Sequence, residues 1–331
     1  MRGNKIFDKK SVKAFWLFWE KFGIVIIFML VAGIFAIIDP RVIQPGQLIS
    51  VINRSSWVAV AAIGMTFAIC SGGFDLSVGS IMSLSGCLMA KLIMDNGVPT
   101  GLAVVLTLAA ALCCGAANGF LITKMKIQPF VATLSTMLVF GSVTQTYTRN
   151  TGTFIGAGQY GQGLSLLGRG EFIGVPSKIF IVAVLFVLAF AAYRGTRFGT
   201  KVRAIGSNDL AARTSGINAD NILIIVYILT AVTAAMAAIL YTATVQSASP
   251  KAGSGFELDV ITAVVLGGTA LSGGKGNLAG TFIGAILVSF SKMCLNFISA
   301  PEATQVIVTG AILLFALSIS GIKIITQREA V

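Results

Sequence analysis

Long apolar runs alternate with short polar segments along almost the whole chain. Most runs are near the roughly 20 residues that an α-helix needs to cross a bilayer, so the pattern predicts transmembrane helices. The predicted spans are 22–38, 50–70, 77–94, 100–123, 129–147, 177–193, 221–245, 257–272, 278–297 and 303–321. The first span lacks a small-residue cleavage site after it, so we expect a retained helix and not a signal peptide.

The composition indicates the same class of protein. The chain has 331 residues, of which 56% are apolar and 11% charged, and its mean hydropathy is +0.90. These values are typical of an all-α polytopic membrane protein and exclude an ordinary soluble domain. The five cysteines lie inside predicted spans without CxxC spacing, so we interpret them as small packing residues. They are Cys70, Cys87, Cys113, Cys114 and Cys294.

The net charge of +12 is concentrated in short segments between spans. If the N-terminus is cytoplasmic, the inner segments hold sixteen of the twenty-four Lys and Arg, as the positive-inside rule requires. This arrangement argues against nucleic-acid binding and predicts that both termini are cytoplasmic. The predicted division of the single membrane domain, 1–331, is a cytoplasmic segment 1–21, a first repeat 22–147, an external loop 148–176, a second repeat 177–321 that includes a cytoplasmic loop 194–220, and a cytoplasmic tail 322–331.

The most informative stretch runs from Ser71 to Gly86, SGGFDLSVGSIMSLSG, and places Asp75 at the expected membrane depth. A bare carboxylate there costs about 2.5 kcal/mol or more. Gly72 and Gly73 can end one helix in a left-handed turn, and Asp75 can cap the next helix at the positive end of its dipole. The stretch therefore predicts a broken membrane helix.

A related stretch begins 182 residues later, at Gly253 to Gly268, GSGFELDVITAVVLGG. Both contain Gly-Phe-acid-Leu, and Glu257 aligns with Asp75. Five predicted spans, an odd number, separate the two breaks, so the two halves are expected to insert in opposite orientations. The predicted fold is about ten transmembrane helices in two inverted five-helix repeats. Small residues such as Gly115 and Gly119 are expected to let helices pack closely.

Two loops are long. The segment Asn150 to Ser177 is expected outside, and Arg194 to Asp220 is expected to be a basic cytoplasmic loop. The second contains a predicted short helix at 209–214 with Asn208 as its N-cap. Two interpretations of this loop stay open: a docking element for a cytoplasmic partner, or a solvated loop that only orients the chain.

The sequence offers no catalytic centre. GAGQYG at 156–161 matches a dinucleotide motif but follows no predicted strand, and GGKG at 273–276 lacks the other residues of a phosphate-binding loop. The chain has no histidine, and no nucleophile and base stand at a recognisable spacing. We therefore predict no catalytic residue, no metal ligand and no cofactor in this chain.

Four blocks carry a family resemblance. They are GMTFAICSGGFDLSVGSIMSLSG at 64–86, KIQPFVATLSTM at 126–137, TRFGTKVRAIGSNDLAARTSGI at 196–217, and ELDVITAVVLGGTALSGGKGNLAGTFIGAILV at 257–288. In this order they resemble the permease subunits of ribose-type monosaccharide ABC importers. The resemblance extends from about 50 to 318.

The resemblance implies a working complex. A nucleotide-binding ATPase subunit, which binds ATP and Mg, would attach from the inside, a second permease copy would complete a homodimer or heterodimer, and an extracytoplasmic binding protein would deliver the sugar. It implies a multi-pass protein of the bacterial inner membrane. The residues that it assigns to ATPase coupling are Gly206, Asn208, Leu210, Ala211, Ala212, Ser215 and Gly216.

Combined with the paired breaks, the resemblance predicts a route for a neutral sugar. The residues expected to line or support it are Phe74, Asp75, Ser77, Phe256, Glu257 and Asp259. A purely structural role for the three acids, as helix caps, stays open. So do other importer substrates, namely a nucleoside, a branched-chain amino acid or a sugar-like signal, and an ion-coupled secondary transporter.

Overall fold

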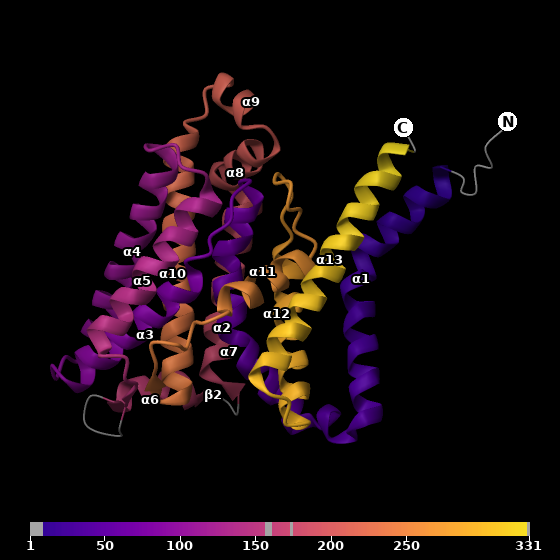
Figure 1. The fold of residues 1–331 in the computed structure, drawn as a ribbon. Helices are drawn as coiled ribbons and strands as arrows, with labels where there is room; N and C mark the ends of the chain where they lie inside the picture. The colour runs from indigo at the N-terminus through magenta and orange to yellow at the C-terminus, as the bar shows by residue number, and fades with distance from the viewer. Residues whose placement is uncertain (1–8, 156–160, 173–174, 330–331) are drawn as a thin grey trace.

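The computed structural model describes residues 9–155, 161–172 and 175–329. Within these ranges the chain is almost entirely helical, with a bundle of long helices side by side (Figure 1). The helices are α1 (Lys9–Ile38), η1 (Pro40–Ile43, a 3-10 helix), α2 (Pro45–Cys70), α3 (Val78–Met94), α4 (Thr100–Thr123), α5 (Pro129–Thr148), α6 (Gly161–Arg169), α7 (Ser177–Gly195), α8 (Arg197–Ser207), α9 (Asp209–Thr214), α10 (Ala219–Val245), α11 (Phe256–Leu266), α12 (Leu278–Phe297) and α13 (Glu302–Glu329).

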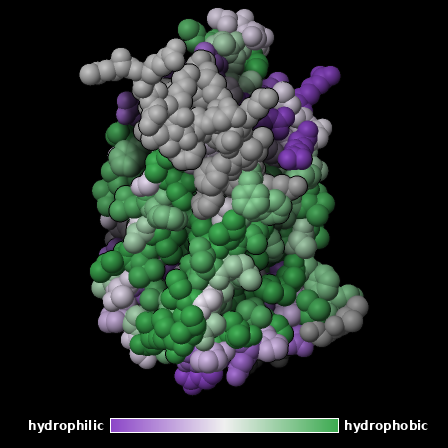
Figure 2. All heavy atoms as spheres, turned by 90° about the vertical axis from the view of Figure 1, so that its right-hand side faces the viewer, coloured by the Kyte–Doolittle hydropathy of each residue, from purple (hydrophilic) through white to green (hydrophobic). Residues whose placement is uncertain are grey.

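The apolar surface is that of a membrane protein. The helices α2, α4, α7, α10 and α12 are long and apolar enough to cross a bilayer. Shorter apolar stretches occur at Phe22–Ile38 in α1, Val78–Met94 in α3 and Ala303–Ile319 in α13. Figure 2 shows hydrophobic residues over the middle of one face and hydrophilic residues toward its two ends. The predicted all-α polytopic class is confirmed.

The helices α2 and α10 form the centre of the fold and run antiparallel. The Trp57 ring of α2 lies edge-on to the Tyr241 ring of α10, with ring centroids 5.5 Å apart. Two helical turns further along α2, a Cβ on Gly64 would come within 2.6 Å of the α10 backbone. Gly115 and Gly119 give α4 the same close approach to α10, as predicted for small residues in membrane helices.

The two breaks enter the protein from opposite ends. The first break (residues 71–77) follows the C-terminus of α2, and the second break (residues 246–255) follows that of α10. Because α2 and α10 are antiparallel, the two segments return into the interior in opposite directions (Figure 1). These directions agree with an inverted relation between the halves. The full arrangement of two five-helix repeats stays a prediction.

The segments that the sequence groups as inner share one end of the molecule. This end, which we call the α9 end, holds α8, α9, the first turns of α1 and the last turns of α13 (Figure 1). The α4–α5 turn lies at the same end, because its Lys126 contacts Asp220 at the start of α10. The α11–α12 connection also lies there, because Gly274 donates a hydrogen bond to the carbonyl of Cys70, the last residue of α2. The sidedness of this end in the membrane stays a prediction, and residues 1–8 and 330–331 lie outside the described residues.

The connection between α5 and α7 lies at the opposite end, which we call the α6 end (Figure 1). It contains α6 and three strands, β1 (Thr153–Phe154), β2 (Glu171–Phe172) and β3 (Val175–Pro176). β1 pairs antiparallel with β4 (Ser247–Ala248), the start of the second break, and β2 pairs with β3. The GAGQYG stretch falls almost wholly outside the described residues.

One predicted boundary is wrong. The span expected at 257–272 is helical only to Leu266 in α11, where Gly267 and Gly268 end the helix, the latter with φ of +85°. At 1.5 Å per residue α11 is about 16 Å long, which is too short to cross a bilayer. The residues after it, GGTALSGGKGN at 267–277, form a connection that runs to the α9 end. The other predicted spans agree with the observed helices, although α1 begins well before its apolar run.

Candidate functional site

The first break is held by a chain of buried hydrogen bonds. Gly72 adopts φ of +88° directly after α2. Asp75 Oδ1 accepts hydrogen bonds from the backbone N–H of Ser77 at 3.0 Å and from its hydroxyl at 2.6 Å. Asn118 of α4 donates its Nδ2–H to the same Ser77 Oγ at 2.8 Å. The predicted broken helix is confirmed, with Gly72 in the left-handed turn.

The expectation that Asp75 caps α3 is wrong in one respect. The helix begins at Val78 with Ser77 at the N-cap position, so Asp75 lies two residues before the cap. Ser77 already has helical backbone angles, which turn its own N–H toward the carboxylate. Asp75 therefore stabilises the turn that leads into the helix and leaves the N–H groups of the first helical turn to other partners.

Two acceptors of the residues that make these hydrogen bonds have no partner among the described residues. They are Asp75 Oδ2 and Asn118 Oδ1, and both side chains are fully buried. A buried acceptor without a donor costs about 1–3 kcal/mol. The centre of the first break thus has two buried acceptors that no described residue satisfies, an exception to polar pairing of the kind that occurs at functional sites.

The second break ends at Gly255, whose φ of +75° starts α11. Glu257 and Asp259 lie in the first turn of α11, where the helix dipole favours acids. Asp259 forms an ion pair with Lys292 of α12. One of the two acids that follow the second break, Asp259, thus has a direct counter-charge in Lys292.

Sequence reasoning missed Lys292. The signal was present, since a lysine within the apolar run 278–297 is costly at membrane depth and needs an acid nearby. The spacing alone could not identify the acid, because Asp259 lies 33 residues earlier in the chain.

The two breaks meet across the first turns of α3. A Cβ on Gly79 would lie 2.2 Å from Glu257 Oε2 and 2.3 Å from the Gly253 carbonyl oxygen. One turn later, Ser83 Oγ accepts the Gly253 N–H at 2.8 Å. Only a glycine at position 79 allows this approach, and it brings Glu257 against the helix that Asp75 precedes.

The structure therefore brings the predicted pathway residues into one region but buries most of them. Phe74 and Glu257 are partly exposed. Four others are buried in this chain: Asp75, Ser77, Phe256 and Asp259. The Phe74 carbonyl lies near two donors, Tyr227 and Thr133, each at 3.4 Å. Among the six predicted pathway residues, Phe74 and Glu257 are therefore the two that are not buried in this conformation.

The predicted short helix is present as α9, with the predicted bounds. Asn208 Oδ1 accepts the N–H of Ala211 at 3.0 Å, so its role as N-cap is confirmed. Leu210 is 73% exposed, whereas Ala212 is buried. Four further residues predicted for coupling are exposed, and they are Asn208, Ala211, Ser215 and Gly216. Gly206 lies inward, at the end of α8.

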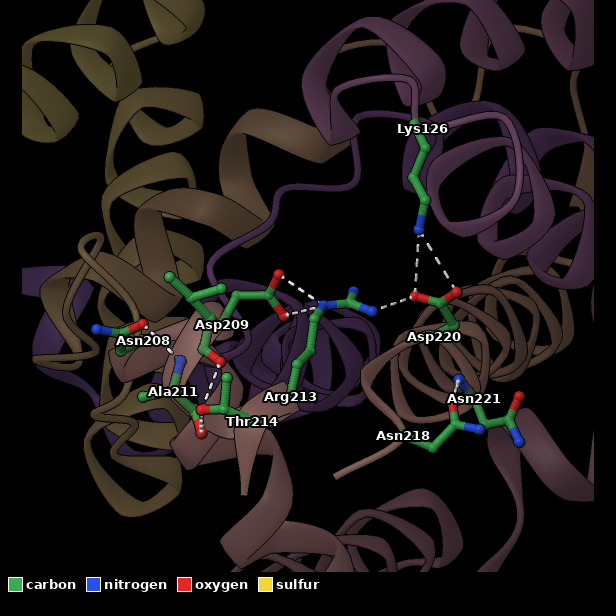
Figure 3. Close-up of polar contacts among 10 residues, drawn as sticks. Lys126, Asn208, Asp209, Ala211, Arg213, Thr214, Asn218, Asp220 and Asn221 are labelled. Carbon is green, nitrogen blue, oxygen red and sulfur yellow. Dashed lines mark hydrogen bonds and ion pairs between the residues drawn. The ribbon is translucent and has the colours of Figure 1, made fainter. Parts of the chain in front are cut away.

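A network of charges fixes α9 to the bundle (Figure 3). Arg213 lies 2.9 Å from Asp209 and 2.9 Å from Asp220 at the start of α10. Asp220 is also 3.5 Å from Lys126 and 3.7 Å from Lys124. The hydrogen bond to Asp209, followed by that to Asp220, raises the pKa of Arg213. Each exposed pair contributes little, but the network orients α9 relative to α4, α5 and α10.

The chain is similar to known transport proteins over nearly its whole length. A family described as "Branched-chain amino acid transport system / permease component" matches residues 47–317. The ribose import permease protein RbsC of Escherichia coli K12 is 36% identical over 322 residues, covering 97% of this chain and 98% of RbsC. RbsC of Bacillus subtilis is 37% identical over 298 residues, covering 90% and 91%. The D-allose transport system permease protein AlsC of Escherichia coli K12 is 30% identical over 316 residues, covering 94% and 95%. No solved structure matches.

Proposed function

This chain belongs to the branched-chain amino acid transport system / permease component family, and from that premise we propose how it moves its substrate. It is a transport subunit and not an enzyme. The relatives that cover almost its full length are sugar permeases, for ribose and for D-allose. The function supported best is therefore the membrane-spanning permease of an ATP-driven ABC importer for a monosaccharide. The single observation that carries this conclusion is the end-to-end match to ribose permeases.

An ABC permease requires an ATPase subunit and a substrate-binding protein. We place the ATPase on α9, because α9 combines an exposed apolar side chain, Leu210, with a network of ion pairs that orients the helix. An apolar anchor at the centre of a polar surface is the usual core of a docking site. The α9 end would then be cytoplasmic, which gives the positive-inside bias its expected direction. ATP and Mg would bind in the ATPase.

The route for the sugar is proposed along the two breaks, at an interface with a second permease copy. A neutral sugar needs hydrogen-bonding groups and a ring face, and Glu257 and Phe74 supply both at partly exposed positions. The other four predicted pathway residues would hold Phe74 and Glu257 in position and would not touch the sugar, since they are buried in this conformation. They are Asp75, Ser77, Phe256 and Asp259. Irregular backbone at membrane depth is tolerated where protein covers it or where it lines a cavity.

Alternating access would follow from the opposite entry of the two breaks. The first break enters the protein from the α9 end and the second from the α6 end, so a tilt of α3 against α11 would close one side as it opens the other. ATP binding in the partner would shift α9 and drive this movement. The binding protein would deliver sugar at the α6 end, where α6 and the two small sheets lie.

The experiment is a pull-down of the tagged permease from membranes in mild detergent, with identification of the co-purifying chains by mass. The variant Leu210→Asp is expected to lose the ATPase subunit, because it puts a charge at the proposed anchor. The matched control is Leu166→Asp, since Leu166 is similarly exposed, at 69%, but lies on α6 at the other end. Loss of the ATPase in both variants, or in neither, contradicts docking through α9.

Substrate class is tested with proteoliposomes that contain the recovered complex and its binding protein. ATP-dependent uptake of ribose or allose is expected, because the reported relatives are permeases for these sugars. The family description names branched-chain amino acids, so labelled leucine is the competing substrate, with a nucleoside as a further one. Uptake of leucine without sugar uptake overturns the monosaccharide assignment. Uptake driven by an ion gradient without ATP overturns the ABC importer and supports an ion-coupled secondary transporter.

A further inference from the structure

Three segments meet by backbone contact at the α9 end. A Cβ on Gly206, in the last turn of α8, would lie 1.8 Å from the Cys70 carbonyl oxygen and 2.6 Å from the Gly274 nitrogen. Gly274 N–H donates to that same Cys70 oxygen at 2.8 Å. A Cβ on Gly273, which has φ of +80°, would lie 2.5 Å from the Gly206 oxygen. We call these residues, Cys70, Gly206, Gly273 and Gly274, the glycine junction.

Each segment of the glycine junction leads directly to a different functional region. Cys70 is the last residue of α2, so the first break with Asp75 begins at the next position. Gly273 and Gly274 lie in the connection between α11, which carries Glu257, and α12. Gly206 is the next-to-last residue of α8, and α9 starts three residues after it. The junction thus joins α9 to both halves of the proposed sugar route.

Tyr193 bonds the same three segments through its side chain. Its hydroxyl accepts the Gly276 N–H at 2.7 Å and lies 3.3 Å from Cys70 Sγ. Arg203 of α8 donates to the Tyr193 carbonyl oxygen at 2.7 Å, and its guanidinium lies 4.9 Å from the centre of the tyrosine ring. Tyr193 is only 4% exposed. One buried residue of α7 therefore connects α8, α2 and the α11–α12 connection.

Contacts of this kind transmit displacement well. Side chains absorb a small shift by changing rotamer, but at the glycine junction the backbones touch with no side chain between them. Closely packed elements respond to displacement by moving together between discrete arrangements. We propose that Tyr193 and the glycine junction transmit movement of α9 to both breaks at once, with Tyr193 as a positioning residue. The inference rests on the proposed ATPase docking at α9.

The test uses the complete permease–ATPase complex in lipid nanodiscs. Deuterium exchange is measured with and without vanadate-trapped nucleotide, a readout that needs no knowledge of the sugar. In the wild type, nucleotide is expected to change exchange in three regions together: 207–215, 71–77 and 267–277. In Tyr193→Phe the change at 207–215 is expected to persist. At 71–77 and 267–277 it is expected to fall about tenfold, which corresponds to 1.4 kcal/mol of lost coupling.

The matched control is Tyr241→Phe, which also removes one hydroxyl but lies in α10 beside Trp57, away from the glycine junction. It is expected to behave as the wild type. If Tyr193→Phe does not assemble, Arg203→Gln provides the same comparison, since it removes the bond to the Tyr193 carbonyl and keeps the hydroxyl bonds. A merely structural role of Tyr193 predicts equal losses in all three regions.

The outcomes separate the inference from its premise. If wild-type exchange changes at 207–215 but not at the breaks, or if Tyr193→Phe leaves all three changes intact, transmission through the junction is wrong while ATPase docking stands. Equal losses in all three regions also overturn it. If no ATPase binds the wild-type permease, the proposed function is wrong and the inference falls with it.

Discussion

The two halves share the motif Gly-Phe-acid-Leu, at residues 73–76 and 255–258, but stabilise its acid and the neighbouring acid in different ways. Asp75 relies on hydrogen bonds from Ser77, and one of its oxygens has no partner among the described residues. At the position equivalent to Ser77 the second half has Asp259, which is paired with Lys292 of the next helix. The Asp75 carboxylate is therefore stabilised by neutral hydrogen-bond donors, and the Asp259 carboxylate by the positive charge of Lys292. The helix also begins at different aligned positions, Val78 in one half and Phe256 in the other. Similar sequence in two halves therefore fixes neither the start of the helix nor the electrostatics, which depend on the neighbouring helices.

The largest expected effect breaks the ion pair. In Lys292→Met, Asp259 stays buried without its counter-charge, and the free energy of unfolding is expected to fall by about 3 kcal/mol. This is the lower end of the range for a broken buried pair, because about a third of the lysine side chain is exposed. Denaturant titration of the purified protein in detergent measures it.

The double variant Lys292→Met with Asp259→Asn sharpens this result, since it removes both charges and is expected to recover most of the loss. The control is Lys91→Met, because Lys91 and Asp95 form a more exposed pair within one helix. That variant is expected to cost about 0.5 kcal/mol or less. Equal costs for Lys91 and Lys292 would contradict a buried pair.

The next effect tests the contact that joins the two breaks. Gly79→Ala places a methyl group against Glu257 and the Gly253 carbonyl, and overpacking of this kind costs about 1–3 kcal/mol. The uptake rate per folded permease is also expected to fall, since the proposed sugar route passes this contact. Gly101→Ala is the control, because nothing lies within 4 Å of its added Cβ. Uptake at the wild-type rate by Gly79→Ala would show that the contact of α3 with Glu257 is not part of the sugar route.

A smaller effect is expected at the first break. Asp75→Ala leaves the buried Ser77 N–H and hydroxyl without their acceptor, which costs about 1–3 kcal/mol. Asp75→Asn keeps a carbonyl oxygen for both bonds and is expected to cost less than 1 kcal/mol. Thermal unfolding and uptake are measured together. Normal uptake by Asp75→Asn would leave Asp75 a structural role only, whereas its loss at normal membrane levels would show that the charge itself is needed.

The smallest effect on stability is expected at Glu257. Its side chain is partly exposed and no hydrogen bond from another side chain holds it among the described contacts. Glu257→Gln is expected to change the free energy of unfolding by about 0.5 kcal/mol or less, while the apparent KM for sugar rises severalfold. Uptake kinetics in proteoliposomes measure this split. If Glu257→Gln lost as much stability as Asp75→Ala, Glu257 would have a structural role like that of Asp75.

Local sequence predicted much of this molecule because the information was local. Apolar runs gave most helix ranges, and Asn208 gave the start of α9. The left-handed turn at Gly72 followed from the glycine pair. The end of α11 at Leu266 was missed, although Gly267 and Gly268 after it repeat the glycine-pair signal of Gly72 and Gly73. An apolar composition does not show where a helix stops, whereas a glycine pair is a common helix end.

The candidate site was predicted as a set of residues but not as a set of contacts. The pairing of Asp259 with Lys292 and the approach of Glu257 to Gly79 depend on which helices become neighbours. That choice is a property of the whole fold. The same holds for Tyr193 and Asn118, which are ordinary residues of apolar spans until α2 and α3 are placed beside them.

The contact between Gly79 and Glu257 also has a consequence for biosynthesis. The ribosome makes Glu257 roughly 180 residues after Gly79, and at about 5–20 residues per second this takes on the order of 10–40 s. During that interval Gly79 of α3 lacks the contact with Glu257 and Gly253, while Asn118 of α4 can already donate to Ser77, the residue that bonds the Asp75 carboxylate. The first half of the protein must therefore survive as a partly open intermediate until the second half arrives to close it.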